Sequence, residues 1–170
     1  MKPLLVSTFD IQGGAARAAY RLHAGLRQSG VDSRMLVQEK ASDDYTVRGP
    51  DSKSAYLFAR IRANFDSGPL YLSPKHHTAF FSSALLPDIL KNEINVIDPD
   101  IVHLHWVSYG FMRIETLAAI RRPIVWTLHD MWPFTGGCHY SEGCERYMNS
   151  CGCCPQLSSE KQYDLSRWNV

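Results

Sequence analysis

The sequence lacks any long run of apolar residues. No stretch approaches the roughly 20 apolar residues that a membrane-spanning helix needs. The apolar run 3–9 near the start is too short for a secretory signal, and no cleavage site of small residues follows it. These absences predict a cytoplasmic protein, a setting in which structural disulfides are rare.

The chain also has almost no excess of charge of either sign. It has 18 Lys and Arg against 17 Asp and Glu, a formal net charge of +1 at pH 7. This balance gives no reason to expect nucleic acid as a partner. Hydrophobic residues make up 45% and charged residues 21% of the 170, which is typical of a globular protein. No repeat or low-complexity linker divides the chain, so 1–170 is predicted to be a single domain.

Apolar runs alternate with stretches of helical periodicity along the chain. Strands are predicted at 4–9, 33–38, 101–106 and 124–128, with a short one at 45–47, and helices at 15–28, 55–65, 88–97, 113–121 and 158–168. The strand at 124–128 is expected to be buried. This order predicts an α/β, Rossmann-like three-layer domain with a mostly parallel sheet.

Gly13 and Gly14 follow the first predicted strand and precede the first helix. Glycines allow a tight turn, and the free N–H groups of a helix start attract phosphate. Arg17, one turn further on, either adds positive charge to such a site or is a solvated arginine. The motif is not G-x-G-x-x-G, and no acidic residue suitably closes the second strand, which disfavours a dinucleotide-dependent oxidoreductase. We predict that this turn contacts phosphate, with a plain turn as the alternative.

His129 and Asp130 lie where the predicted strand 124–128 ends, and His105 lies near the end of the strand 101–106. Parallel sheets bind ligands at the edge where their strands end. A neutral imidazole there can donate a hydrogen bond to a substrate oxygen, and a carboxylate can orient it or receive a proton. The period of a strand places His103 and His105 on one face, where a satisfied core histidine is the common outcome. We predict that His129 and Asp130 are catalytic and that His105 binds substrate.

One loop, 136–157, holds every cysteine of the protein: Cys138, Cys144, Cys151, Cys153 and Cys154. Four thiolates from a short loop make a natural tetrahedral zinc site, which is structural because it is closed. The predicted ligands are Cys138, Cys144, Cys151 and Cys154, since the last two have the usual two-residue knuckle spacing. Cys153 is then the spare thiol, and His139 is an alternative fourth ligand. Two disulfides or free thiols are the alternatives to a metal.

The predicted helix 55–65 combines apolar residues with arginines. Such a helix could contact a membrane surface. We expect instead that its apolar side packs on the core. The basic cluster Lys75-His76-His77, in a predicted loop, is expected to be solvated.

Four stretches together have a specific pattern: Gly13–Arg17 (GGAAR), Asp100–Trp106 (DIVHLHW), Trp126–Tyr140 (WTLHDMWPFTGGCHY) and Cys154–Leu157 (CPQL). They resemble the N-terminal half of bacterial glycosyltransferase family 4 enzymes, above all the group used in exopolysaccharide synthesis of the colanic-acid type. The long block 126–140 is the specific part, and the resemblance covers nearly the full 170 residues.

The resemblance implies the acceptor-side half of a GT-B fold, in which two Rossmann-like domains face a cleft. It implies a retaining transfer from a nucleotide-sugar donor to a glycan or lipid-linked acceptor, without a catalytic metal. A lipid-linked acceptor would bring the protein to the inner face of the membrane. Gly13 and Gly14 would approach the donor diphosphate, and His129 the transferred sugar. The C-terminal donor-binding domain is absent from these 170 residues, which are therefore expected to be inactive alone.

A non-enzymatic, zinc-stapled interaction domain is the competing interpretation. Its contact surface would be the cysteine loop with three aromatic residues, Trp132, Phe134 and Tyr140, which are expected to be exposed. Titration with sugar nucleotides would help to distinguish the two.

Overall fold

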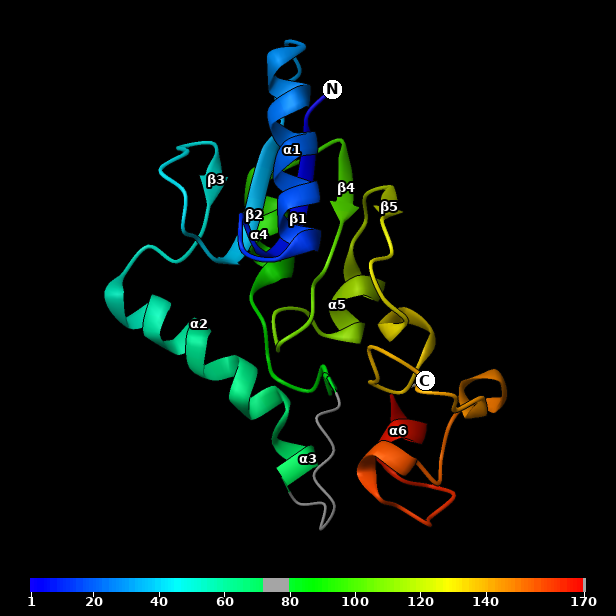
Figure 1. The fold of residues 1–170 in the computed structure, drawn as a ribbon. Coiled ribbons are helices and arrows are strands. Elements are labelled where there is room, and N and C mark those ends of the chain that lie inside the picture. Colours follow the sequence, from blue (N-terminus) through cyan, green and yellow to red (C-terminus); the bar gives the residue numbers. More distant parts are fainter. Residues whose placement is uncertain (72–79, 170) are drawn as a thin grey trace.

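The computed structural model describes residues 1–71 and 80–169, so the predicted basic cluster Lys75-His76-His77 lies outside the described residues. A five-stranded sheet forms its centre, in the order β3-β2-β1-β4-β5 (Figure 1). Its strands are β1 (Pro3–Phe9), β2 (Arg34–Glu39), β3 (Val47–Arg48), β4 (Ile101–Leu104) and β5 (Ile124–Trp126). Every pairing between them is parallel. The predicted α/β class with a parallel sheet is confirmed.

Helices cover both faces of this sheet. The helices of the described residues are α1 (Gly14–Gln28), α2 (Lys53–Asp66), α3 (Gly68–Tyr71), α4 (Leu90–Ile97), α5 (Ile114–Ala119) and α6 (Leu165–Trp168). On one face, Ala19 of α1 packs with Leu5 and Met35 of the strands. On the other, α4 buries Leu90 and Ile94 in a larger cluster with β1, β2 and β4. The molecule therefore has three layers, with α1 and α4 on opposite faces (Figure 1).

β1 is the central strand, and its sequence PLLVSTF explains why. Residues 3–8 are all buried, because β1 pairs with β2 on one side and with β4 on the other. A continuous run of this kind is what a strand covered on both faces requires. The carboxyl end of β1 leads directly into the glycine turn before α1.

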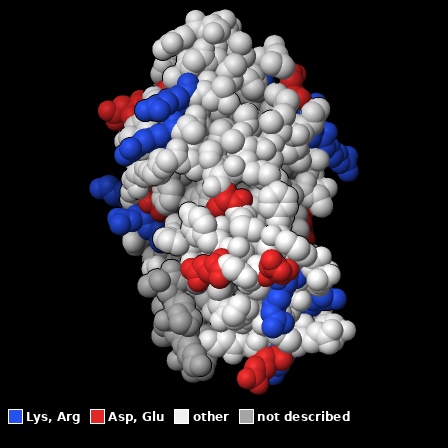
Figure 2. Space-filling view, turned by 45° about the vertical axis from the view of Figure 1, so that its right-hand side comes forward, with Lys and Arg blue, Asp and Glu red and all other residues white. Residues whose placement is uncertain are grey.

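The prediction of a buried strand at 124–128 was wrong in length and in burial. β5 spans only Ile124–Trp126, and its first two side chains are 40% and 45% exposed. It lies at the edge of the sheet, where β4 is its partner among the described residues. Figure 2 brings this side forward and shows Lys and Arg mainly toward the margins, with Asp and Glu side chains among uncharged residues between them. Apolar composition alone could not distinguish an edge strand from a central one.

Two helix predictions also need correction. The predicted helix 158–168 forms only over α6, and the chain before it runs through short 3-10 turns at Trp132–Phe134, Arg146–Asn149 and Pro155–Leu157. α2 forms, but its apolar side does not pack on the core as expected. The side chains exposed on it are Tyr56, Leu57, Phe58, Ile61 and Phe65. α2 slants away from the sheet, so only its inner side meets the domain (Figure 1).

The inner side of α2 is anchored by polar contacts. Arg62 donates to the carbonyl oxygens of Gly110 and Pro87, the latter at 2.6 Å. Asp66 is fully buried and accepts from the hydroxyl of Ser83 and the N–H of Ala84, each at 2.9 Å. No helix in the described part of the chain is both long enough and apolar enough to cross a bilayer.

Candidate active site

The glycine turn lies at the sheet edge where β1 ends. Gly13 has a φ of +86°, a left-handed conformation that glycine adopts without strain, and α1 starts at Gly14. Both glycines are exposed, and a Cβ added at either would meet nothing within 4 Å. Arg17 is also exposed, and its N–H donates to Gly13 O at 3.2 Å to close the first turn. The helix start is therefore open to a ligand.

Three histidines stack at the same edge, where β4 and β5 end. The rings of His103 and His105 are 4.5 Å apart, which confirms that they share a face, and those of His105 and His129 are 5.3 Å apart. His105 Nδ1 lies 3.0 Å from His129 Nε2, and His103 Nε2 lies 2.8 Å from Thr127 Oγ1. His105 is buried, whereas His129 is exposed. The outermost histidine is thus held from beneath by a buried one.

Burial keeps this stack neutral. It lowers the pKa of His105 to about 4, with further lowering by His103 and His129. Burial lowers the pKa of His103, and His129 lowers it further. The pKa of His129 is also lowered by burial, against an opposing effect of Asp130. Uncharged imidazoles at pH 7 can donate or accept hydrogen bonds, or accept a proton.

The contact between His105 and His129 has two arrangements of hydrogen. In one, His105 Nδ1–H donates to His129 Nε2, so the free Nδ1 of His129 has the other hydrogen. In the reverse arrangement, His105 would have its hydrogen on Nε2, which is buried without a partner among the described residues. Buried unpaired donors are rarer than under-satisfied acceptors. The first arrangement is therefore favoured, and it makes His129 Nδ1 a hydrogen-bond donor.

Asp130 turns away from this stack and into the protein. Its Oδ2 accepts from Trp106 Nε1 at 2.6 Å and contacts His139 Nδ1 at 2.5 Å, while Oδ1 accepts from the N–H of Trp132 at 2.9 Å. Burial alone would raise the pKa of Asp130, but these hydrogen bonds outweigh it and lower the pKa. The predicted catalytic role of Asp130 is untested, and its contacts suit a residue that positions the loop after His129.

His139 is part of this network, although the sequence suggested it only as an alternative metal ligand. It is buried, and its Nε2 lies 3.0 Å from Ser82 Oγ. His139 thereby joins Asp130 to the segment around Ser82, as does Trp132, whose Nε1 donates to Ser82 O at 3.0 Å. Trp132 is only 6% exposed, so the expectation that it is exposed was wrong. Phe134 and Tyr140 are exposed as expected.

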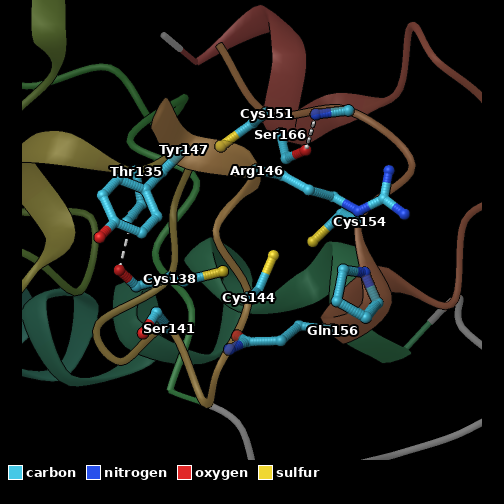
Figure 3. Close-up of a pocket in the computed structure, with 12 residues that line it drawn as sticks. Thr135, Cys138, Ser141, Cys144, Arg146, Tyr147, Cys151, Cys154, Gln156 and Ser166 are labelled. Carbon is cyan, nitrogen blue, oxygen red and sulfur yellow. Dashed lines mark hydrogen bonds between the residues drawn. The ribbon is translucent and has the colours of Figure 1, made fainter. Parts of the chain in front are cut away.

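The four predicted zinc ligands lie around one small cavity. Its lining includes Cys138, Cys144, Cys151 and Cys154 but not Cys153 (Figure 3). All five cysteines are free thiols in this structure. Among the described residues, no three cysteines, histidines or carboxylates are arranged closely enough to hold a metal ion as they stand. The four predicted ligands therefore line the same cavity but do not form a closed metal site in this arrangement.

The glycine turn and the histidine stack lie within the part of the chain that one family model matches. The model of glycosyltransferase family 4 matches residues 12–151, most of the chain. The chain belongs to this family. Parallel sheets bind ligands at the edge where their strands end, so Gly13, Gly14 and His129 are the candidate substrate contacts of this chain.

Among curated proteins, the chain is similar to one from Escherichia coli (strain K12) named as a colanic acid biosynthesis glycosyl transferase, WcaC. The two are 24% identical over an alignment of 170 positions that covers 92% of this chain. The chain spans about 40% of the length of that relative. No solved structure matches the chain significantly.

Proposed function

We propose that this chain is the acceptor-side half of a retaining glycosyltransferase. The enzyme would transfer a sugar from a nucleotide-sugar donor to a glycan or lipid-linked acceptor in the synthesis of an exopolysaccharide. Membership of glycosyltransferase family 4 and the similarity to a protein named for colanic acid biosynthesis support this proposal. The family resemblance implies that a second domain holds most of the donor and that no catalytic metal takes part, so the isolated chain would not turn over.

The observation that carries the proposal is the placement of His129. It is an exposed, neutral imidazole at the substrate edge of the sheet, and His105 fixes its ring from below at 3.0 Å. Its Nδ1–H would donate to a hydroxyl of the transferred sugar. Such a donor, held in position before the substrate arrives, lowers the barrier by orienting the sugar and stabilising developing charge.

The start of α1 would interact with the donor diphosphate. The first N–H groups of α1 point out of the helix end beside the exposed Gly13, where the partial positive charge of the helix favours an anion. Arg17 lies one turn along the same helix and would add charge. Departure of the nucleoside diphosphate leaves negative charge on its oxygens, and these groups would stabilise it.

The complete protein that contains this chain provides the test. We would incubate it with a panel of nucleotide sugars and a membrane extract containing lipid-linked acceptors, and follow release of nucleoside diphosphate. Transfer of one sugar with unchanged anomeric configuration would support the proposal. Transfer with inverted configuration would overturn the retaining mechanism, and absence of transfer with every donor would favour the interaction-domain alternative.

We also propose that α2 binds the surface of the inner membrane, where a lipid-linked acceptor resides. Leu57, Ile61 and Phe65 repeat every four residues and form an exposed stripe beside Phe58. Lys53 and Arg60, also exposed, flank one side of this stripe. An apolar stripe beside basic residues is the pattern of a helix that lies in the interface of an anionic bilayer.

Vesicles of phosphatidylcholine with phosphatidylglycerol test this contact in a flotation assay with the complete protein. Leu57→Glu should reduce the bound fraction strongly, because it places a charge in the stripe. Val96→Glu is the matched control, since Val96 is also an exposed apolar residue but lies on α4. Equal binding by the wild type and the Leu57 variant would contradict the proposal.

A further inference from the structure

We propose that Cys138, Cys144, Cys151 and Cys154 bind one zinc ion, which fixes the loop 136–157 against the domain. The proposal goes beyond the transferase function, because the site is structural and its ligands are not the residues proposed to contact substrate. It rests on the arrangement of the four side chains around one cavity and on the fold of the loop between them.

The cavity has the size and the walls that a single ion needs. Its volume is about 20 Å³, enough for one ion or water molecule. In Figure 3 the sulfur atoms of Cys138, Cys144 and Cys154 point toward a shared space, and Cys151 approaches it from the opposite side. Zinc binds thiolate sulfur at about 2.3 Å. The four side chains would have to draw inward by rotation to reach that distance, since the described residues hold no closed site.

Two groups around the cavity suit a zinc–thiolate centre. The N–H of Gly136 donates to Cys151 Sγ at 3.4 Å. The side chain of Arg146 also lines the cavity. Four thiolates around Zn²⁺ leave an excess of negative charge, and both groups would compensate for it. The donor set and its surroundings therefore fit zinc.

The structure also assigns the ligands that the sequence left open. Cys153 does not line the cavity, and its Sγ donates to Glu160 O at 3.4 Å. His139 has both ring nitrogens in contact with other groups, Asp130 and Ser82, within the buried network. Neither residue is available without breaking existing contacts. The fourth ligand is thus Cys154, which is separated from Cys151 by two residues.

The loop needs such a cross-link because it has little core of its own. No residue from Tyr140 to Ser150 is buried, and its regular structure there is one short 3-10 turn. Four consecutive residues, 150–153, have positive φ values, which range from 46° at Cys153 to 94° at Gly152. Three of them are not glycine, so this conformation is unfavourable unless the surroundings fix it. Zinc bound on both sides of this turn would do so.

The ion would also support the active site indirectly. The backbone of Cys138 forms an isolated antiparallel β-bridge with that of Phe81, and the neighbouring His139 contacts Asp130 at 2.5 Å. Ligation of Cys138 would fix the segment that holds Asp130, and with it the loop that follows His129. Loss of zinc should therefore disorder the loop first and lower turnover as a consequence.

Metal analysis of the complete protein, purified under reducing conditions, tests the proposal without an activity assay. We expect about one zinc per chain by mass spectrometry and X-ray absorption dominated by sulfur at about 2.3 Å. Cys154→Ser should lose most of the zinc, whereas the matched control Cys153→Ser should retain it. The reverse pattern would overturn the ligand assignment.

A variant that fails to fold would not decide the matter, so the wild type gives a second measurement. Removal of metal with a chelator should lower the melting temperature, and added ZnCl₂ should restore it. Protein that holds no zinc after purification and takes up none from ZnCl₂ would overturn the proposal. Intact-mass evidence for disulfides among the four cysteines in the native protein would overturn it as well.

Discussion

His105 lies beneath His129, with 3.0 Å between Nδ1 of the first and Nε2 of the second and with their rings stacked. The buried member directly follows β4, which pairs with the central strand β1, and the exposed member lies at the carboxyl edge of the sheet. His105, a buried residue just after β4, thereby supports the ring of His129, which is proposed to contact substrate. Under the proposed function, this contact gives His105 a positioning role, whereas the sequence predicted that it binds substrate.

Replacement of His105 should therefore act through His129. We expect His105→Leu to lower kcat of the complete enzyme by about 10- to 100-fold, because a small misplacement of a reacting group costs this much. His105→Asn offers an N–H near the position of Nδ1 and should recover part of the loss. KM for the donor should change less than kcat in both variants. A kcat of His105→Leu equal to that of the wild type would contradict this role.

The pKa of His105 predicts how stability depends on pH. An unfolded histidine binds its proton near pH 6.5 and the folded one only at about 4. The unfolded state thus binds more protons in between, so stability is complete above pH 6.5 and is lost as pH falls toward 4. The effect amounts to at most about 3 kcal/mol.

Urea unfolding between pH 7 and pH 5 measures this dependence. The buried carboxylates whose pKa is lowered, Asp10 and Asp130, titrate below this range. The other histidines with a lowered pKa, His23, His103 and His129, act in the same direction. Asp66 and Glu39, whose pKa burial raises, act in the opposite direction. His105→Asn should therefore reduce the slope without abolishing it. An unchanged slope would show that the imidazole of His105 is not held neutral by burial.

Asp130 should matter for stability as much as for turnover. Asp130→Ala removes the acceptor of Trp106 Nε1, His139 Nδ1 and the N–H of Trp132 at once. Loss of a buried carboxylate with three donors costs about 3 kcal/mol in the free energy of unfolding. The exposed Asp43 is the control, and Asp43→Ala should change the free energy by less than about 0.5 kcal/mol. Equal urea midpoints for the two variants would contradict the network.

Two glycines allow a matched comparison of backbone requirements. Gly137 has a φ of +128°, and a Cβ there would lie 2.4 Å from the ring of Phe81. Gly137→Ala should therefore destabilise the protein by about 2 kcal/mol or more. Gly25 lies within α1, where a Cβ meets nothing, so Gly25→Ala should stabilise it by about 0.5–1 kcal/mol. Thermal unfolding of both variants gives the answer, and equal melting temperatures would be inconsistent with the packing of Gly137.

Much of the fold could be predicted because its signals are local. The continuous apolar run of β1 and the periodic alanines and leucines of α1 determine strand and helix over short distances. The parallel sheet then follows from the order of elements. The edge position of β5 and the exposure of α2 could not be predicted this way, because burial depends on which segments cover an element in space.

The site was predictable to a similar extent. Strand ends located His105, His129 and the glycine turn, and the clustering of cysteines indicated a shared site. The contacts of Asp130 with Trp106 and His139 could not be foreseen, since they join residues 24 and 9 positions apart with no periodic relation. A paired His-Asp sequence suggested that the two side chains act together, whereas the backbone turns them in different directions.

The most direct test of the account is the turnover number of His129→Ala in the complete enzyme. Its matched control is Leu128→Ala, which removes an adjacent and exposed side chain. We expect kcat to fall by about 100-fold or more for His129→Ala, with a melting temperature close to that of the wild type, and to be nearly unchanged for Leu128→Ala. A His129→Ala enzyme with the kcat of the wild type would contradict the central claim that this histidine contacts the transferred sugar.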